Sequence, residues 1–247
     1  MDWLRQLDPL WISYIAFGVL FTVVELTRPA RRLRYRKTLL RDIAAALVYQ
    51  FGVTTAANYI CSPAGEFAKS HLSASVAALW LAPRVVVFYL AADLGSYWMH
   101  RLMHTHRLWR VHRWHHSPEQ LYWLAGTRAS IPQQVLFNLP TIAALPILAG
   151  APGWLVVAIL IEGMFRNNWM HANLTWRSNW LELIFVTPRY HHIHHSSDAE
   201  LHDGNYGSLF TLWDRLFGTY LDPDTTRPKK FGTGEPPRDP VWMALGV

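Results

Sequence analysis

The chain has 247 residues, of which 51% are hydrophobic and only 16% are charged, with a formal net charge of +6. Soluble domains usually carry about 25% charged residues, so this composition excludes a disordered chain and argues against a small water-soluble enzyme. A single cysteine, Cys61, excludes an intrachain disulfide and a cysteine-based metal site. The sequence therefore predicts a membrane protein.

Long uncharged runs indicate where the chain crosses the bilayer. Runs of 16, 23 and 33 residues begin after Asp8, Asp42 and Arg128. A helix needs about 20 apolar residues to cross the hydrocarbon core, so the longest run predicts two crossings separated by the turn signal at 150–153. The first run is short, which leaves open whether it is tilted, extended through Glu25 or only partly inserted. We expect an all-α integral membrane protein with four or five transmembrane helices, roughly at 9-26, 43-62, 77-99, 131-149 and 153-171.

Charged residues around these helices predict the topology. Residues 28–41 contain seven lysines and arginines, and such clusters lie on the cytoplasmic side. Five spans then place 28–41 and the histidine-rich stretches in the cytoplasm, in a bacterial inner membrane rather than the endoplasmic reticulum. The basic run is interpreted as a topology signal that contacts anionic lipids, not nucleic acid. Within the spans, Arg84 and Glu162 are expected to pair; the alternative has Arg84 reaching the lipid head groups.

The predicted domain organisation is simple. Residues 1-222 form one membrane-embedded domain, in which 172–222 are expected to make a helical cap on the cytoplasmic side. Residues 223-247 form a Pro-rich C-terminal tail, and the five prolines of 223–240 predict a loose segment.

Histidines are the strongest functional signal. Ten of the 13 histidines fall in two windows, 100-116 and 191-195. Their spacings of three and four residues direct several imidazoles to one helix face, and neutral imidazole binds iron, zinc, copper or nickel. Eight such histidines exceed what one ion can hold, so the sequence predicts a dimetal site. The candidate ligands are His100, His104, His112, His115, His116, His191, His194 and His195.

Five further positions bear on this site. Asp93 lies seven residues before His100, on the same helix face. It is expected to accept a ring N–H from a ligand histidine, or else to pair with an arginine at the membrane interface. His171 ends the last predicted span and is interpreted as a ligand rather than a hydrogen-bonded interfacial histidine. The roles of the remaining histidines near the boxes, which are expected to be solvated or to lie beside the ligands, stay open: His106, His192 and His202.

The order HxxxH, HxxHH, HxxHH resembles the fatty acid hydroxylase/sterol desaturase superfamily of membrane di-iron enzymes. The segments DLGSYWMHRLMH, WRVHRWHHSPE, TPRYHHIHHSSD and HDGNYGSLFTLWDRLFGTY extend the resemblance over about 85–220. It implies that the eight box histidines and His171 bind two irons, with Asp203, Asn205 and Tyr206 beside them. Many relatives carry a histidine shortly after the position of Arg128, where this chain has Ala129 and Ser130; this departure leaves the substrate class open.

The resemblance implies an oxygenase that uses O2 to hydroxylate, or as the second choice to desaturate, an unactivated C–H bond of a lipid. An acyl chain, a sterol-like lipid and a lipid head group all remain possible substrates. Zinc can replace iron in purified protein. No cytochrome b5 module is visible, so a separate ferredoxin- or cytochrome b5-like electron donor is expected. The alternatives are a zinc-dependent membrane lipid enzyme, a non-enzymatic metal-binding or transport protein, and a haem cytochrome, which would need histidines within the bilayer.

Overall fold

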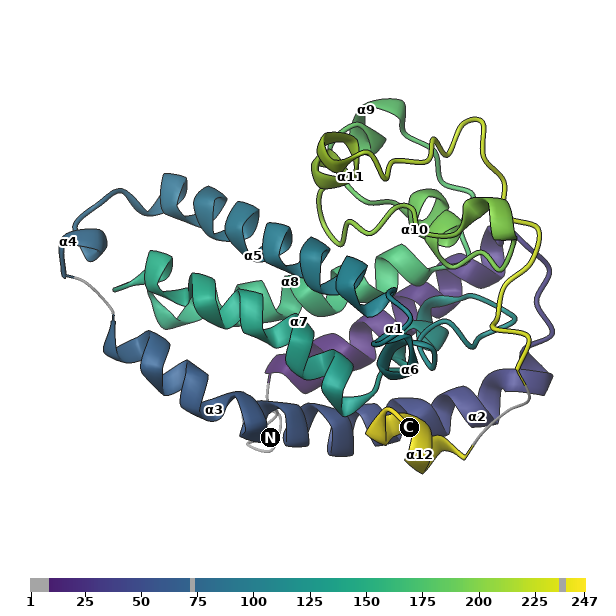
Figure 1. Cartoon of the computed structure of the whole chain (residues 1–247), viewed down its shortest axis with the longest axis horizontal. Coiled ribbons are helices and arrows are strands. Elements are labelled where there is room, and N and C mark those ends of the chain that lie inside the picture. Colours follow the sequence, from purple (N-terminus) through teal and green to yellow (C-terminus); the bar gives the residue numbers. More distant parts are fainter. Residues whose placement is uncertain (1–8, 72–73, 236–238) are drawn as a thin grey trace, which may run out of the picture.

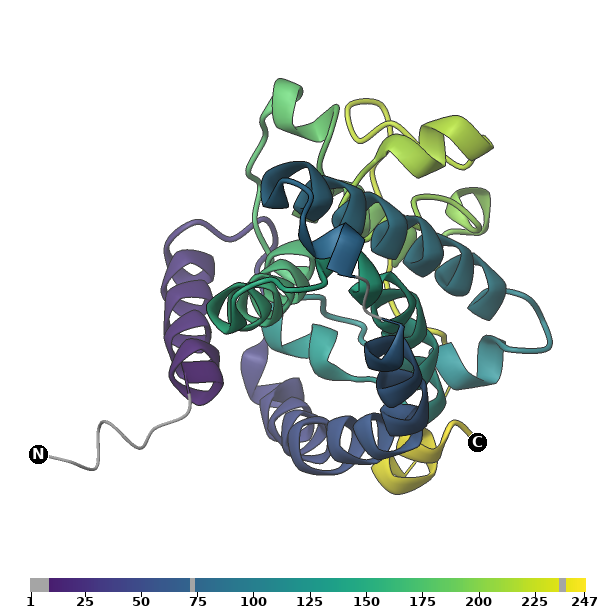
Figure 2. The same ribbon diagram turned by 90° about the vertical axis from the view of Figure 1, so that its left-hand side faces the viewer.

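The computed structural model describes residues 9–71, 74–235 and 239–247, and the regular elements of these residues are all helical (Figure 1, Figure 2). The all-α prediction is confirmed; residues 1–8 of the predicted domain lie outside the described part. The longer helices are α1 (Pro9–Thr27), α2 (Tyr35–Leu47), α3 (Thr54–Ser70), α5 (Leu81–Met103), α7 (Ile131–Ala144) and α8 (Gly153–His171). The shorter elements are η2 (Val48–Val53), α4 (Ala74–Ala77), α6 (Trp109–His112), η3 (Trp123–Thr127), η4 (Leu145–Leu148), α9 (Asn179–Glu182), α10 (Pro188–His194), η5 (Ala199–Leu201), α11 (Leu212–Phe217) and α12 (Pro240–Leu245).

Three helical segments of the described chain are long and apolar enough to cross a membrane. They are Pro9–Thr27, Thr38–Ser70 and Ile131–Leu148. The first helix extends through Glu25, which agrees with the alternative that the short first run continues beyond its uncharged residues. The second runs from α2 through the π-helical turn η2 into α3 without a break. The other two predicted spans correspond to α5 and α8, whose charged residues keep them outside this set, so five crossings stay a prediction.

The long helices form a layered bundle, and the predicted ligand histidines lie at one end of it. Helix α7 packs between α3 and α5, and α1 packs against α8 and η3. Figure 1 shows α5, α7 and the continuous α2–α3 segment stacked from top to bottom, and Figure 2 shows α1 beside α8. Phe88 and Ala92 of α5 pack on Ala144 and Leu148. This apolar contact stabilises the packing of α5 on α7 and η4.

Arg84 does not pair with Glu162, so the expected ion pair is wrong. The Arg84 guanidinium is 7% exposed and donates to backbone carbonyls, including those of Ile147 (2.8 Å) and Ala149. Carbonyls at a helix end lack partners within the helix, and the arginine satisfies them. Glu162 instead pairs with Arg166, one turn further along α8 (3.0 Å).

Residues 172–222 form a cap of short elements over the C-terminal ends of α5 and α8. In Figure 1 α9, α10 and α11 gather on one side of the bundle. Tyr97 of α5 packs with Tyr206 and Trp213, and Met170 of α8 packs with Val186 and Tyr190. These contacts fix the third histidine box against the ends of the two long helices.

The C-terminal segment is packed rather than loose, which corrects the expectation drawn from its prolines. Ser196 and Phe231 form an isolated β-bridge, and Phe231 packs beside Leu121 and Tyr122. Asp239 caps α12 by accepting from the Val241 N–H (2.8 Å). Met243 and Ala244 of this helix are buried against Ala45, Val53 and Trp114. Residues 236–238 lie outside the described part.

Candidate metal centre

The predicted ligand histidines converge into two adjacent groups. One ring nitrogen from each member lies within 4.8 Å of the others in its group. The first group consists of His100, His104, His112, His116 and His194, and the second of His115, His171, His191 and His195. All nine predicted ligands are therefore brought together, in sets of five and four rather than four and four.

Each of the last two boxes divides between the groups, which the spacing alone did not indicate. His112 and His116, four residues apart, enter the first group, whereas His115 enters the second. In the third box His191 and His195 enter the second group, and His194 the first. Residues three and four apart lie on the same side of a helix, so helical spacing by itself would have placed the three histidines of each box together.

Local sequence explains how these segments turn. The Thr187 hydroxyl accepts from the Tyr190 N–H (3.4 Å), and Pro188 occupies the first turn, so α10 begins just before the third box. The second box is not one helix: α6 ends at His112, and tight turns carry 113–116. The His115 N–H donates to the His112 carbonyl (2.9 Å), which holds this turn.

Backbone carbonyls orient the imidazole rings. The Nδ1–H of His100 donates to the Tyr206 carbonyl (2.8 Å) and that of His115 to the Arg128 carbonyl (3.1 Å). The same bond joins His171 to the Asn167 carbonyl (2.7 Å) and His194 to the Gly204 carbonyl (3.0 Å). A carbonyl can only accept, so Nδ1 carries the proton in these four rings. Their Nε2 atoms consequently present lone pairs to the groups.

These lone pairs face one another at distances that indicate a shared cation. The Nε2 atoms of His115 and His171 are 3.2 Å apart, although neither carries a proton to donate. The Nε2 atoms of His171 and His191, and of His191 and His195, are 3.1 Å apart. In the first group the Nε2 atoms of His100 and His112 are 3.0 Å apart.

Unpartnered nitrogens support the same conclusion. The Nε2 atoms of His104 and His194 are buried and have no hydrogen-bond partner. Two ligand nitrogens about 2.1 Å from one ion lie about 3.0 Å apart at a right angle and about 3.4 Å apart at a tetrahedral angle. The nitrogen separations in both groups match adjacent positions around one ion, so the residues present fit two metal ions.

Burial keeps the imidazoles neutral, the state that binds a metal. Removal from water lowers the pKa of His100 to about 3, and the bond to the Tyr206 carbonyl opposes this only in part. Burial likewise lowers the pKa of His115 to about 4. The pKa values of His112 and His194 are also lowered, first by burial and then by neighbouring imidazoles. At neutral pH the ligands therefore need not release protons before binding.

Gly126 lets η3 pass directly over a ligand. A Cβ at this position would lie 2.5 Å from both Cγ and Nδ1 of His171. The close approach places the Arg128 carbonyl, two residues on, against His115. Glycine is the residue that allows a backbone to come so near to a side chain.

The predicted neighbours of the ligands have different roles from those expected. Asp93 contacts none of the histidines; it accepts from the N–H groups of Leu209 and Phe210 (2.9 Å each) and from Trp213 Nε1 (3.0 Å). Seven residues along a helix amount to about 10 Å, too far for a carboxylate to reach the His100 ring. Its alternative arginine partner is present, since Arg166 lies 4.0 Å away. Asp93 thus fastens the cap to α5.

Tyr206 is the one predicted neighbour that contacts ligands directly. Its ring packs on His100, His104 and His194 at 5.6, 5.0 and 5.5 Å between centroids, in addition to the carbonyl bond. The Tyr206 hydroxyl donates to Asp203 (3.0 Å).

Asn205 and Asp203 shape the loop beside Tyr206 instead of touching the rings. Asn205 donates to the carbonyls of Tyr190 and Leu221. Both loop residues have positive φ, 62° and 57° for Asp203 and Asn205. Asn and Asp tolerate this conformation better than most residues.

The structure also places the three histidines that do not follow the box spacing. His192 Nε2–H donates to the His171 carbonyl (3.3 Å), so it lies beside a ligand. His106 and His202 are exposed, in agreement with the expectation of solvated side chains.

Two buried carboxylates support the site although neither was singled out from the sequence. Asp42 is fully buried, pairs with Arg128 and accepts from the Tyr122 hydroxyl (2.6 Å). Asp214 accepts from the Tyr206 N–H (2.8 Å), the Gly207 N–H (2.7 Å) and the Tyr190 hydroxyl. Asp42 lies far in sequence from its partners, so only the folded chain reveals its network, whereas Asp214 lies within the segment HDGNYGSLFTLWDRLFGTY that carried the family resemblance.

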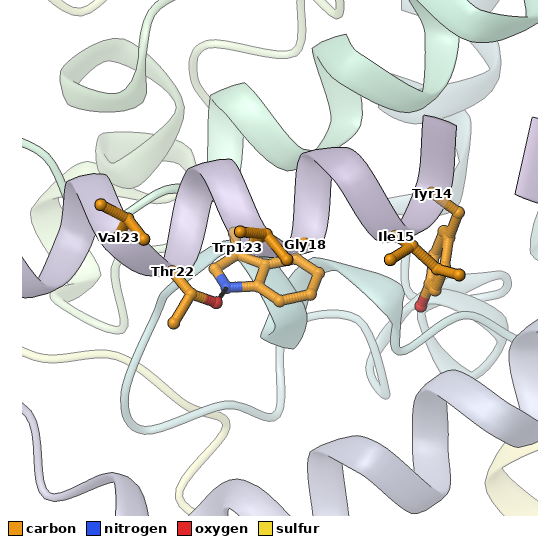
Figure 3. A pocket seen from close by; sticks show the side chains of 7 residues that line it. Tyr14, Ile15, Gly18, Thr22, Val23 and Trp123 are labelled. Atoms are coloured by element: carbon orange, nitrogen blue, oxygen red, sulfur yellow. Dashed lines mark hydrogen bonds between the residues drawn. The ribbon is translucent and has the colours of Figure 1, made fainter. Parts of the chain in front are cut away.

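Two cavities of the described chain lie away from the histidine groups. A groove of about 410 Å³ is lined by Trp123 and by α1 residues including Tyr14, Gly18 and Thr22 (Figure 3). Trp123 Nε1 donates to the Thr22 hydroxyl (3.0 Å). A cavity of about 770 Å³ lies beside Arg84, near the opposite ends of α5 and α7. No histidine of either group lines these two cavities.

Fold and site together define a helical membrane protein with a cluster of histidines able to bind metal. The sequence profile of the fatty acid hydroxylase family matches residues 85–219, over half of the chain. The chain belongs to the fatty acid hydroxylase family, and the predicted resemblance is confirmed.

Three curated relatives show how far the likeness extends. The chain is 33% identical over 230 residues to the ornithine lipid hydroxylase OlsE of Rhizobium tropici, a match that covers 87% of this chain and 68% of OlsE. It is 34% identical over 145 residues to an alkylglycerol monooxygenase of Danio rerio, covering 57% of this chain and 30% of that protein. It is 28% identical over 157 residues to the methylsterol monooxygenase erg25A of Aspergillus fumigatus, covering 61% and 51%. No solved structure matches the chain.

Proposed function

We propose that the chain is a membrane-bound di-iron oxygenase that uses O2 to hydroxylate an unactivated C–H bond of a lipid. The observation that carries this proposal is the pair of adjacent groups, which offer five and four histidine nitrogens and no sulfur or carboxylate ligand. Named relatives in the same family are monooxygenases and hydroxylases.

The donor set favours iron over zinc. Five imidazoles in one group exceed the four ligands of a tetrahedral zinc site. Bound iron would supply redox chemistry and O2 activation, which zinc does not.

The chain's own residues prepare the site for this chemistry. The carbonyls of Tyr206, Arg128, Asn167 and Gly204 hold the proton of four ligands at Nδ1, so that Nε2 stays free to bind. Burial excludes water from eight of the nine histidines. A dry, preorganised site directs oxidising equivalents to the substrate and limits side reactions with solvent.

We propose a lipid substrate and a site on the cytoplasmic side. By name, the three relatives act on ornithine lipid, alkylglycerol and methylsterol, which share a long apolar body. The histidines lie at the ends of long helices, next to the leaflet from which the chain of a lipid would reach them. The basic run 28–41 favours the cytoplasmic leaflet. Hydroxylation needs two electrons from a separate donor protein.

The first experiment is to count metals in protein purified from iron-fed cells, with Mössbauer spectra of ⁵⁷Fe-enriched protein. About two irons per chain with a coupled spectrum are expected for the wild type. His112→Ala should disturb the first group and His115→Ala the second, whereas exposed His106→Ala serves as the matched control. Zinc that persists after iron feeding, in protein that acts on lipid without O2 or reductant, would refute the proposal. Lipid extracts of cells with and without the gene would then reveal the substrate.

A further inference from the structure

The first histidine group approaches solvent at one ligand. Of the nine histidines in the two groups, His104 alone is partly exposed, and the other eight are buried. His104 is the residue that follows α5, where the chain leaves the long helix and turns towards α6. Any molecule that acts on the metal centre from the aqueous side therefore meets His104 first.

A partly exposed aromatic ring lies beside this ligand. The Trp109 ring centroid is 5.3 Å from that of His104 and 5.2 Å from that of His116. The turn between them is fixed, because the Thr105 carbonyl accepts from the N–H groups of Leu108 (3.0 Å) and Trp109 (2.8 Å). Trp109 thus joins the surface to two ligands through continuous ring contacts.

The surface around His104 and Trp109 is basic. Arg107 and Arg110 are exposed, and within the described chain neither takes part in an ion pair or a side-chain hydrogen bond. Both lie within three residues of Trp109. One acid, Asp203, is exposed on the neighbouring loop, where it accepts from the Tyr206 hydroxyl. We call the exposed parts of 104–110 the basic rim.

We propose that the basic rim is the docking surface for an acidic protein that donates single electrons. The inference rests on the proposed function, in which RH + O2 + 2 H⁺ + 2 e⁻ gives ROH + H2O. A one-electron carrier must bind twice per turnover, and each time it is oxidised by one electron. Unpaired arginines steer an acidic partner by long-range attraction. Electron transfer weakens steeply with distance, so docking belongs where a ligand ring approaches the surface.

Lipid contact is the competing use of these arginines, and the structure favours the donor. The basic run 28–41 already lies between two segments able to cross a membrane, where head groups are expected. Arg107 instead lies in the turn between His104 and Trp109, and Arg110 directly follows Trp109, whose ring touches two of the proposed ligands.

The test uses the full chain in nanodiscs with a plant-type [2Fe–2S] ferredoxin of acidic pI and, in parallel, soluble cytochrome b5. The double variant Arg107→Glu/Arg110→Glu is compared with Arg32→Glu/Arg36→Glu, which changes the same charge on the basic run. Binding of the oxidised donor, oxidation of the reduced donor and metal content are measured. At 50 mM KCl we expect the rim variant to bind about tenfold more weakly and to oxidise the donor correspondingly more slowly. Metal content should not change, and the control pair should stay within about twofold.

Other outcomes would overturn the docking proposal. These are equal losses in both double variants, no loss in the rim variant, no binding of either donor by the wild type, or a loss confined to nanodiscs that contain phosphatidylglycerol. If the proposed function were wrong, the wild-type protein would lack the coupled iron pair, whether or not it bound the donors. Product formation driven by dithionite separates the two: the rim variant should retain it.

Discussion

Gly126→Ala gives the sharpest prediction for the metal centre, because the variant adds one methyl group against one ligand. The new Cβ would lie 2.5 Å from the His171 ring, whereas ordinary contacts begin at 3.4 Å. The ring or η3 must therefore move by about 0.9 Å. Metal–nitrogen bonds tolerate only about 0.2 Å, so a ring that moves this far no longer binds.

The expected result is selective loss from the second group. Iron content should fall from about two towards one per chain, and hydroxylation should fall at least 100-fold, in line with the cost of a 1 Å misplacement. The free energy of unfolding should fall by about 1–3 kcal/mol, the usual cost of overpacking. Metal analysis, Mössbauer spectra and thermal unfolding in detergent measure these three effects.

The matched control is Gly65→Ala in α3, where an added Cβ meets nothing within 4 Å. It should bind two irons and be as stable as the wild type or slightly more so, since alanine is the better helix former. A Gly126→Ala variant with two irons and activity within twofold of the wild type would refute the account of His171 as a ligand fixed by η3.

Further predictions concern stability and pH. Asp93→Ala leaves three donors of the cap unpaired and should lower the free energy of unfolding by about 3–5 kcal/mol. Asp93→Asn should lower it by less. Loss of iron from folded Asp93→Ala protein would argue instead for direct contact between Asp93 and a ligand. Glu25 accepts from the N–H groups of Trp123, the first residue of η3, and of Asn173, two residues after His171 (2.8 Å each), so Glu25→Leu should reduce iron content more than Glu25→Gln in metal analysis. Chelation of both metals should lower Tm, and iron at 100 times its Kd should restore about 2.7 kcal/mol; an unchanged Tm would contradict coupling of metal to fold. In the apoprotein the folded pKa values of His100 and His115 are about 3 and about 4, below the unfolded value of about 6.5. The unfolded chain therefore takes up protons first, and denaturant titrations should show stability falling as pH drops from about 6.5 to 4.

The sequence singled out the histidines that converge, because most of their signal is local: eight of the nine follow spacings of three and four residues, which needed no long-range information. His171 lies outside the boxes and was singled out by its place at the end of the last predicted span. That these nine residues bind metal stays a prediction. The division between groups was out of reach, since α6 ends at His112 and 113–116 follow tight turns that no spacing rule describes.

The supporting interactions could not be predicted, because most of them use the backbone. Carbonyls of Tyr206 and Gly204 have no side-chain signature, yet they set the tautomers of His100 and His194. Asp93 was correctly placed on the face of α5 that carries His100, but the rise along the helix was neglected. The proline count of the tail likewise could not show that Phe231 has a buried place to pack.

The division of the boxes makes the two metal groups dependent on each other. His112, His115 and His116 lie within one short turn, and they serve the first, second and first group in that order. The ring of His116 stacks on that of His195 across the groups, 4.3 Å between centroids. A shift of the turn would therefore displace members of both groups at once. Buried anchors around this turn, such as Ser130 donating to the Val111 carbonyl (2.6 Å), consequently hold the two groups in place relative to each other as well as the fold.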